Sequence, residues 1–340
     1  EIRPETDISD AAKTIGYPVL VKASAGGGGK GMRVVESPDT LVAAVESAQR
    51  EAKNAFGDDK VFLEKWLESV KHVEVQIVGD KHGNILHCFE RECSIQRRHQ
   101  KIIEEAPSPA VDEKLRDALG KSAIEAAKTL NYFSTGTVEF LLSEQDFYFL
   151  EVNTRLQVEH PVTEEILGID LVREQIRIAE NKKLSFSQDD LQICGHAIEA
   201  RVYAEDPQKN FLPSPGKIQT WAPSSSDNVR FDSGVEEGSF VSPEFDPMIA
   251  KVICHAPTRT EAAKSLAKSL RNTKLYGIKN NKEFLELTLL SKSFLDGDTT
   301  TDFIERVNPN RIRELSSKNL EEAAIAIAME SQAINRNSAR

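Results

Sequence analysis

Glu151-Val-Asn-Thr-Arg-Leu-Gln-Val-Glu-His160 carries a polar side chain at every second position from its first residue. In an extended chain, alternate side chains share one face. We therefore expect one strand face to present Glu151, Asn153, Arg155, Gln157 and Glu159. A buried core rejects two carboxylates and a guanidinium unless each has a partner or a metal, whereas a solvated strand edge accepts them. The segment indicates either a reaction site or an exposed edge.

A hairpin is predicted around this segment, because the apolar-rich runs Thr137–Leu142 and Phe147–Val152 flank a short polar turn. Glu139 and Glu151 are equidistant from the centre of that turn, so we expect them to face each other across the two strands. Opposed carboxylates repel unless a divalent cation lies between them, and Mg²⁺ prefers oxygen ligands. Asn153 adds a third oxygen. The alternative is a solvated surface pair, but the apolar neighbours favour metal binding.

A glycine-rich segment, residues 26–31, separates two further predicted strands, Pro18–Lys22 and Met32–Val35. It matches GxGxxG formally, but a dinucleotide fingerprint opens a helix, and this segment leads into a strand. The Walker A pattern also fails, because Gly31 stands where Ser or Thr is required. Four consecutive glycines lower stability unless they serve a purpose. We therefore favour phosphate contact by the loop amides and Lys22 over an ordinary turn.

The remaining pattern predicts an α+β fold. Periodicity and capping residues predict elements in this order: a helix from Ser37-Pro38-Asp39 to about Phe56-Gly57, a strand Val61–Leu67, a hairpin from Val73 to Phe89, a helix Leu115–Leu130, a helix Thr163–Glu180, strands Gly195–Tyr203 and Ile218–Trp221, and a helix Arg311–Met329. We expect a small lobe at 1–67, a larger domain at 68–308 and a helical extension or linker at 309–340.

Composition excludes several classes of function. The chain has 43 basic and 54 acidic residues and a formal charge of −11, which argues against general nucleic-acid binding. No apolar run approaches the ~20 residues of a membrane span, and no signal-peptide pattern opens the chain. We therefore expect an intracellular protein that binds neither nucleic acid nor membrane.

The run from Arg91 to Lys101 is basic within this acidic chain. Such a run is usually a solvated face. It is also suited to be a second anion site. When no ligand is bound, the negative charges of Glu104 and Glu105 would balance its positive charge.

Four motifs in this order resemble the biotin carboxylase family, within the ATP-grasp superfamily. They are Lys22–Arg33, Glu92–Lys101, Glu151–Pro161 and Glu199–Asp206, and the resemblance covers roughly residues 10 to 307. It implies an ATP-grasp fold with a small lid lobe, which carries the glycine loop, and a larger antiparallel-sheet carboxylase domain.

The resemblance also implies the roles of individual residues. ATP would be bound by Lys22, Gly28, Gly29, Glu64, Lys65, Trp66, Leu67, His72, Gln96 and His99. Mg²⁺ or Mn²⁺ would be held by Glu139, Glu151 and Asn153. Bicarbonate would be bound by Lys101, Arg155, Gln157 and Val158. Glu159 would take the proton of bicarbonate, and Arg201 would bind biotin. The catalytic residues would thus be Lys101, Arg155 and Glu159.

The implied reaction is the first half-reaction of a biotin-dependent acyl-CoA carboxylase. ATP would convert bicarbonate to carboxyphosphate, and biotin on a carrier domain would then be carboxylated. The implied partners are that carrier domain, a carboxyltransferase subunit and further copies of this chain in a homo-oligomer. The implied location is the mitochondrial matrix in a eukaryote and the cytoplasm otherwise.

Two features of the chain depart from the family pattern. The family normally begins with a Rossmann-like domain that supplies a further phosphate-binding lysine, and this sequence starts after it, as expected of a fragment or of a defective paralogue. Ser316–Gln332 resembles the link into later domains of methylcrotonyl or propionyl enzymes. Two alternatives therefore remain, namely another ATP-grasp carboxylate ligase of the carbamoyl-phosphate type and a non-catalytic assembly module.

Overall fold

The computed structural model describes residues 7–25, 32–97, 100–143 and 146–307, together with residues 321, 325, 328, 329 and 332. The chain divides into two compact units, Glu1–Pro309 and Asn310–Arg340. The five described residues of the second unit are helical and exposed, so most of the predicted helix Arg311–Met329 lies outside the described residues. Within the described parts, no helix combines the length and apolarity needed to cross a membrane.

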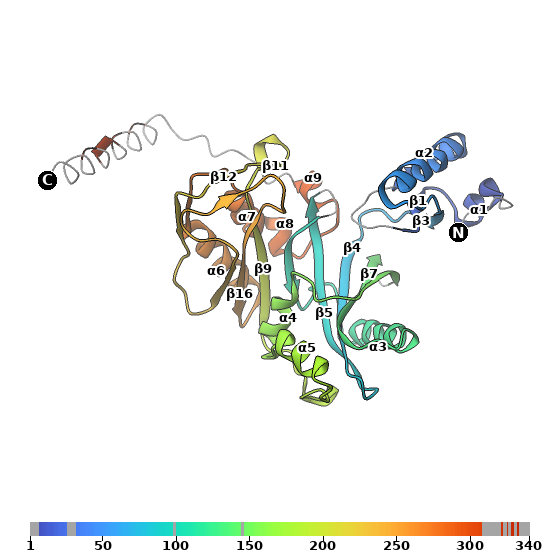
Figure 1. The fold of residues 1–340 in the computed structure, drawn as a ribbon, viewed down its shortest axis with the longest axis horizontal. Coiled ribbons are helices and arrows are strands. Elements are labelled where there is room, and N and C mark those ends of the chain that lie inside the picture. Colours follow the sequence, from blue (N-terminus) through green and yellow to red (C-terminus); the bar gives the residue numbers. More distant parts are fainter. Residues whose placement is uncertain are drawn as a thin grey trace. The chain divides into compact units, whose positions relative to one another are not determined.

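A small three-stranded sheet, ordered β2-β1-β3, forms the first part of the larger unit (Figure 1). Its elements are α1 (Ile8–Ile15), β1 (Val19–Ala23), β2 (Arg33–Val35), α2 (Pro38–Phe56) and β3 (Val61–Lys65). β1 and β2 pair antiparallel, with Val19 opposite Val35, which confirms the predicted hairpin. The glycine segment that joins them, including Gly28 and Gly29, lies outside the described residues.

Helix α2 has the predicted bounds. It starts after Ser37 and ends at Gly57, whose φ of 77° is the left-handed conformation that glycine adopts most readily. The side chains predicted to share its apolar face are buried, namely Leu41, Val45, Ala48 and Ala52. The strand predicted to reach Leu67 ends at Lys65.

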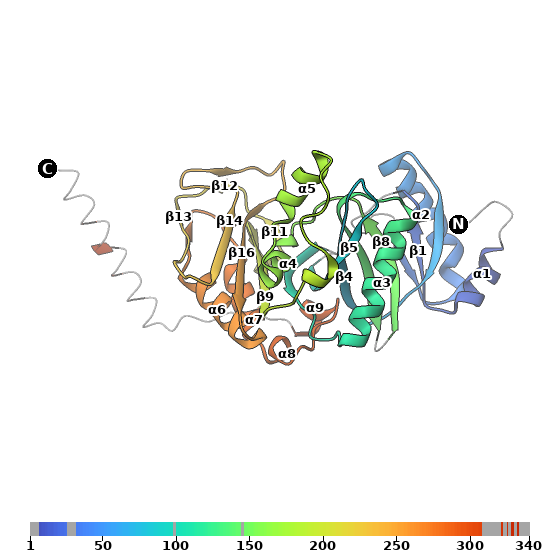
Figure 2. The same ribbon diagram turned by 90° about the horizontal axis from the view of Figure 1, so that it is seen from below.

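An eight-stranded sheet carries the rest of the unit, in the order β14-β16-β9-β6-β5-β4-β7-β8. All its neighbouring strands are antiparallel. The strands are β4 (Lys71–Gly79), β5 (Ile85–Arg97), β6 (Gln100–Ala106), β7 (Ser134–Ser143), β8 (Asp146–Asn153), β9 (His196–Tyr203), β14 (Val229–Ser233) and β16 (Met248–Ala256). Helices α3 (Glu113–Thr129) and α6 (Arg259–Asn272) pack on this sheet (Figure 2). The antiparallel α+β architecture predicted from the sequence is confirmed.

Strand β4 shows how the sheet separates its core from its polar face. Val73, Val75 and Ile77 pack in one apolar cluster with residues of α3. Glu74 and Gln76 alternate with them and are buried on the opposite face, where successive strand positions must point. That face is covered by α4 (His160–Leu167), and it carries the predicted site.

The hairpin of β7 and β8 contains a bulge that aligns the two acidic residues. Ser143 pairs with Asp146 and Phe140 with Phe149, a register that would place Leu150 opposite Glu139. The register shifts by one residue at this point, so Glu151 is opposite Glu139 instead. A bulge adds one residue to one strand and re-aims the side chains beyond it. The predicted facing of Glu139 and Glu151 is confirmed.

The single helix predicted for Thr163–Glu180 was wrong. The segment forms α4 and α5 (Leu171–Ala179), because Gly168 ends α4 with a φ of 66° and Asp170 caps the start of α5. The strand predicted at Ile218–Trp221 is shifted to β13 (Thr220–Ala222). The other short elements are β10 (Glu205–Asp206), β11 (Leu212–Pro213), β12 (Gly216–Lys217), β15 (Phe240–Val241), β17 (Lys274–Tyr276), α7 (Lys282–Leu289), α8 (Lys292–Leu295) and α9 (Phe303–Val307), with single 3₁₀ turns at Gln188–Asp190 and Pro207–Lys209.

Candidate active site

Four charged residues form a row across four adjacent strands. Arg91 on β5 is opposite Glu74 on β4, Glu74 is opposite Glu139 on β7, and Glu139 is opposite Glu151 on β8. Cross-strand partners lie about 5 Å apart and share a face. The sheet register therefore gathers three carboxylates and one guanidinium that are far apart in the sequence.

Lys101 is the centre of this cluster. Its Nζ donates to Glu74 Oε2 at 2.6 Å, to Glu159 Oε1 at 2.7 Å and to Glu139 Oε1 at 2.9 Å. An ammonium group has three hydrogens, so each hydrogen has one carboxylate partner. Lys101 thus holds together β4, β7 and the residue that precedes α4.

The ionisation of the cluster follows from these contacts. Burial tends to raise the pKa of Glu139, but the hydrogen bond from His72 and the charge of Lys101 hold that pKa well below its usual range. Burial also tends to raise the pKa of Glu159, which the charges of Lys101, Arg201 and Arg91 hold well below its usual range. Burial tends to lower the pKa of Lys101, yet Glu74 and Glu159 keep it well above its usual value. Lys101, Glu139 and Glu159 are therefore all ionised at neutral pH.

Asn153 lies between the two predicted metal-binding carboxylates. Its Nδ2 donates to Glu139 Oε1 at 3.0 Å and to Glu151 Oε1 at 3.1 Å. One oxygen of each carboxylate therefore lies within hydrogen-bond distance of the Asn153 amide. A Mg²⁺ ion at that position would also be within reach of both oxygens. Among the described residues, a second possible metal group consists of His72, Glu74 and Glu139, whose ligand atoms lie within 4.8 Å of one another.

The five-residue strand face predicted from Glu151 to Glu159 was wrong in its conformation. Strand β8 ends at Asn153, and the chain turns through a loop before Glu159, the residue directly before α4. Gln157 nevertheless donates to Glu139 Oε1 at 2.9 Å, and Arg155, which is exposed, donates to Asn153 Oδ1 at 3.3 Å. The loop brings together the same residues that a strand would have aligned.

Arg201 lies beside the predicted base. Its Nη2 donates to Glu159 Oε2 at 2.9 Å, and the same nitrogen is 2.5 Å from Glu104 Oε1. Val158 belongs to the same region, because Lys251 on β16 donates to its carbonyl oxygen at 3.0 Å. Lys101, Gln157 and Arg201 thus contact Glu139 or Glu159. Arg155 contacts the neighbouring Asn153, and Val158 directly precedes Glu159.

The interpretation of Arg91–Lys101 as a solvated basic face was wrong. Arg91 is fully buried and donates to Glu74, Gln76, Thr163, Thr137 and Gln157. Glu104 and Glu105 do not complement this run as predicted. Glu104 contacts Arg201, and Glu105 accepts hydrogen bonds from His196 and Arg259.

The residues predicted to bind ATP fall into separate groups. His72 contacts Glu139 through Nε2 at 2.8 Å and Gln96 through Nδ1 at 2.7 Å, so these two join the cluster on the large sheet. The other five lie on the small three-stranded sheet or directly after it, namely Lys22, Glu64, Lys65, Trp66 and Leu67. There Lys22 and Glu64 form an ion pair at 3.7 Å, and Lys65 donates to the Gly16 carbonyl at 2.8 Å. Gly28, Gly29 and His99 lie outside the described residues.

Sequence reasoning missed Glu74 and assigned no individual role to Arg91, although both are central to the site. A signal for Glu74 was present. Val73-Glu-Val-Gln-Ile77 alternates polar and apolar residues, the same pattern that drew attention to Glu151–Glu159. The strand is buried from His72 to Gly79. The burial of Arg91 carried no comparable signal, because its partners come from four other segments.

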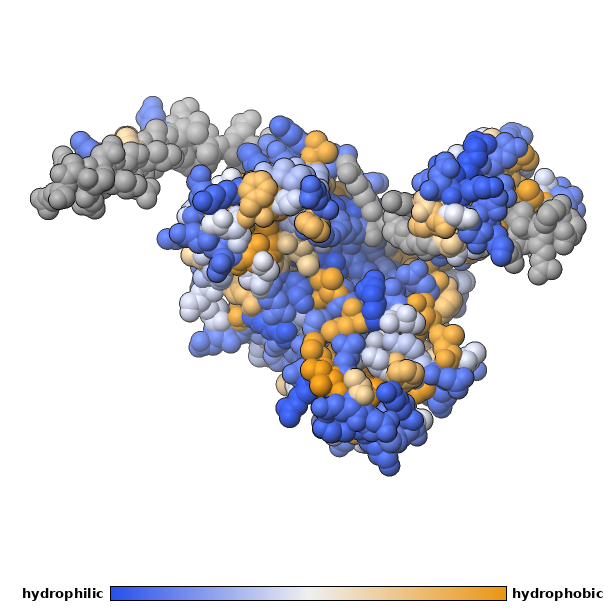
Figure 3. Space-filling model, in the orientation of Figure 1, coloured by the Kyte–Doolittle hydropathy of each residue, from blue (hydrophilic) through white to orange (hydrophobic). Residues whose placement is uncertain are grey.

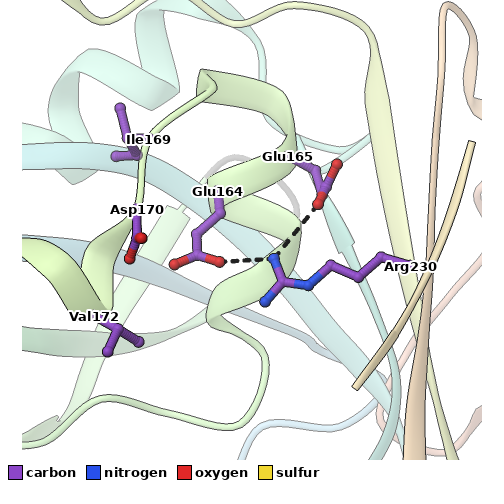
Figure 4. Close-up of a pocket in the computed structure, with 6 residues that line it drawn as sticks. All are labelled: Glu164, Glu165, Ile169, Asp170, Val172 and Arg230. Atoms are coloured by element: carbon purple, nitrogen blue, oxygen red, sulfur yellow. Dashed lines mark hydrogen bonds and ion pairs between the residues drawn. The ribbon is translucent and has the colours of Figure 1, made fainter. Parts of the chain in front are cut away.

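A surface pocket lies apart from these residues. It has a volume of about 460 Å³ and is lined by Glu164, Glu165, Ile169, Asp170, Val172 and Arg230. Figure 4 shows the Arg230 guanidinium turned toward Glu164 and Glu165, with contacts of 2.8 and 3.5 Å. In the view of Figure 3, apolar residues gather over α4 and α5, where Val172 and Ile176 have exposed side chains. No predicted site residue lines this pocket.

Comparison with protein-family models adds two matches. Residues 2–187 match the ATP-binding domain of the carbamoyl-phosphate synthase L chain, and residues 199–306 match the biotin carboxylase C-terminal domain. The fold and the acidic site thus define an ATP-grasp protein.

Relatives identify the family. Biotin carboxylase 2 of Bacillus subtilis is 52% identical over 304 residues, which cover 88% of this chain and 68% of that protein. The mitochondrial methylcrotonoyl-CoA carboxylase subunit alpha of Rattus norvegicus is 48% identical over 299 residues, which cover 87% of this chain and 42% of the relative. The chain belongs to the biotin carboxylase family.

Solved structures agree with this assignment. The biotin carboxylase domain dimer of Hydrogenobacter thermophilus 2-oxoglutarate carboxylase, in complex with MgADP, ADP and bicarbonate, matches with a TM-score of 0.86 and 43% identity, over 88% of this chain and 66% of that one. Campylobacter jejuni biotin carboxylase matches with a TM-score of 0.85 and 45% identity, over 88% and 67%. The chain thus spans about two thirds of these carboxylases and less than half of the rat subunit.

Proposed function

We propose that this chain provides most of the site in which ATP activates bicarbonate and in which biotin, on a carrier domain, is then carboxylated. The observation that carries the proposal is the position of Lys101, whose Nζ lies within 2.9 Å of Glu74, Glu139 and Glu159. A cation in contact with both the metal-binding carboxylate and the base can hold a small anion between them. The family membership of the chain supports the same reaction.

The first step is the binding of bicarbonate. We assign it to Lys101, Arg155, Gln157 and Val158. Arg155 is exposed and has one described side-chain contact, to Asn153, so its guanidinium is free to offer two parallel hydrogen bonds to a planar anion. Gln157 is fixed from both sides, because it donates to Glu139 and accepts from the buried Arg91. The exposed guanidinium of Arg155 and the fixed amide of Gln157 would together orient the anion.

The second step is removal of the bicarbonate proton by Glu159. This carboxylate is ionised, because Lys101, Arg201 and Arg91 keep its pKa well below its usual range despite burial. An ionised carboxylate can accept a proton, but one with so low a pKa is a weak base. Bicarbonate bound at Lys101 would take up part of the lysine charge and raise the pKa of Glu159. Substrate binding would thus strengthen the base when it is needed.

A divalent cation suits the carboxylate pair. Glu139 and Glu151 face each other and both reach the Asn153 amide, and carboxylate and amide oxygens are the donors that Mg²⁺ prefers. These three residues would hold Mg²⁺ or Mn²⁺, which would neutralise phosphate charge during phosphoryl transfer. The nucleotide itself would contact His72 and Gln96 on the large sheet, His99 in the segment between β5 and β6, and Lys22, Gly28, Gly29 and Glu64–Leu67 of the small lobe.

Biotin and the partners follow from the same assignment. Arg201 would bind biotin near Glu159. The proposed partners are the carrier domain, a carboxyltransferase subunit and further copies of this chain in a homo-oligomer. The proposed location is the mitochondrial matrix or the cytoplasm. The carbamoyl-phosphate type of ligase is the second candidate, because the model that matches residues 2–187 carries that name.

The experiment measures ATP hydrolysis by the full-length protein with and without bicarbonate and free biotin. We expect hydrolysis that depends on bicarbonate and rises with biotin, and loss of the biotin effect in Arg155→Ala. Arg173→Ala is the matched control, because Arg173 is exposed on α5, away from the site. Hydrolysis without bicarbonate dependence would contradict the function, and consumption of an amine without biotin would favour the second candidate. Full biotin stimulation in Arg155→Ala would contradict the role of that residue.

A further inference from the structure

Glu104 and Glu199 are two buried carboxylic acids that the proposed reaction does not use. They are opposite each other on the neighbouring strands β6 and β9, and neither has any exposed surface. Among the described residues, no oxygen of either side chain receives a well-oriented hydrogen bond. Buried polar groups without partners are rare in proteins, and ionised ones are especially costly.

The charged groups around the pair do not offset two negative charges. Arg201, on the same strand as Glu199, is the cation in direct contact, at 2.5 Å from Glu104 Oε1. Lys101 of β6 is occupied by its own three carboxylates. Lys251 of β16 is paired with Asp232 at 3.3 Å and with the Val158 carbonyl.

The other titratable groups near the pair add no positive charge. They are the Cys93 thiol of β5, the Tyr203 hydroxyl of β9 and Glu159, the last of which is itself negative. Two carboxylates side by side without solvent do not both ionise, so one proton is expected to stay with them.

The directions of the pKa shifts agree with this geometry. Burial raises the pKa of Glu104 to about 7, against the opposing charge of Arg201. Burial, and next the charge of Glu104, raise the pKa of Glu199 well above its usual value. Near neutral pH the pair therefore keeps a proton, and Glu104 is the member that gains or loses charge there.

Glu104 and Glu159 share one nitrogen of Arg201. The distances from Nη2 are 2.5 Å to Glu104 and 2.9 Å to Glu159. We propose that Glu104 and Glu199 form a proton-holding pair that positions Arg201 and thereby sets how strongly it holds Glu159. This inference rests on the proposed role of Glu159 as the proton acceptor. Glu104 and Glu199 are positioning residues, because they act through Arg201 and touch no substrate.

The sign of the effect follows from the shared nitrogen. When Glu104 is ionised, its negative charge offsets part of the attraction between Arg201 and Glu159. The pKa of Glu159 then rises, and Glu159 becomes a stronger base. When Glu104 is protonated, the positive charge of Arg201 acts mainly on Glu159. The pKa of Glu159 then falls, and Glu159 becomes a weaker base. Bicarbonate-dependent turnover should therefore rise as the pH increases through the titration of Glu104.

The test uses two isosteric variants of the full-length protein, Glu104→Gln and Glu199→Gln, and two readouts. Infrared spectra recorded at about pH 6 and at about pH 8, each compared with the spectrum of the glutamine variant at the same pH, detect protonated carboxyl groups without any substrate. The pH profile of bicarbonate-dependent ATP hydrolysis measures the effect on the base. Glu105→Gln is the matched control, because Glu105 is the neighbouring buried glutamate but pairs with His196 and Arg259.

We expect the parent to show a carboxyl band that persists at high pH and one that titrates. Glu199→Gln should lose the persistent band and keep the pH dependence, because glutamine mimics a protonated glutamate. Glu104→Gln should lose the titrating band, flatten the profile and lower kcat by roughly 10-fold while KM for ATP stays unchanged. Glu105→Gln should keep both bands and the profile. Thermal unfolding shows that each variant is folded.

The two proposals fail in different ways. The proton-holding pair would be contradicted if the active parent showed no band of a protonated carboxyl group. It would also be contradicted if both bands remained in Glu104→Gln and in Glu199→Gln. An unchanged pH profile in Glu104→Gln would overturn its action through Arg201. Bands without any bicarbonate-dependent activity would overturn the proposed function and leave the pair intact.

Discussion

Arg91→Met is the substitution that tests most sharply how the site is held together. Methionine fills much of the arginine volume but removes a guanidinium that is fully buried and reaches five side chains. Removing one partner of a buried ion pair costs about 3–5 kcal/mol. Glu74 keeps its bond to Lys101 at 2.6 Å, so we expect a loss of about 3 kcal/mol, near the lower end of that range.

Thermal unfolding followed by circular dichroism measures this loss. For domains of about this size, 1 kcal/mol shifts Tm by roughly 2–4 °C, so Arg91→Met should melt roughly 6–12 °C lower. Arg173→Met, at an exposed site on α5, should change the stability by at most about 0.5 kcal/mol. If Arg91→Met melts within about 1 °C of the control, the buried network does not stabilise the fold as we argue.

Three further substitutions test separate parts of the account. Glu151→Gln should raise the Mg²⁺ concentration for half-maximal ATP hydrolysis by roughly 10-fold, and an unchanged Mg²⁺ titration would exclude Glu151 as a ligand. Burial tends to raise the pKa of Glu105, but hydrogen bonds from His196 and Arg259 lower it, so its ionised form stabilises the fold above the unfolded pKa of about 4.3 and loses that effect as the pH falls. The Tm difference between the parent and Glu105→Gln should therefore stay constant near neutral pH and shrink as the pH falls below about 4, and a difference that does not vary with pH in this acidic range would contradict the ionised state. Gly168→Ala, at a φ of 66° with no neighbour to clash, should cost about 1 kcal/mol in chemical denaturation, and a stabilised variant would show that the break between α4 and α5 is not due to this glycine.

Local signals in the sequence sufficed for much of the fold. The hairpin of β1 and β2, helix α2 and the hairpin of β7 and β8 follow from apolar periodicity and turn residues that lie within a few positions of one another. The break at Gly168 also had a local signal, because a glycine followed by Asp170 can end one helix and start the next. Continuous apolar periodicity outweighed that signal and led to one helix instead of two.

The sequence pointed to several residues that the structure brings together around Lys101, but not to their geometry. The register of Glu139 and Glu151 followed from the hairpin, while the bulge at Leu150 that produces it depends on pairing across the whole sheet. The end of β8 at Asn153 depends on where α4 packs, and the burial of Arg91 depends on Glu74 and Thr163. Such long-range contacts leave no mark in the residues next to Arg91, so a buried arginine resembles a surface one in the sequence.

The central claim is that this chain activates bicarbonate by phosphorylation. Hydrolysis of ATP with bicarbonate labelled with a heavy oxygen isotope tests it directly, because carboxyphosphate leaves one bicarbonate oxygen on the phosphate that is released. We predict that mass spectrometry of the phosphate will find one labelled oxygen per ATP consumed by the full-length protein, and that Glu159→Gln will suppress this labelled product. Phosphate that carries oxygen from water alone would contradict the account.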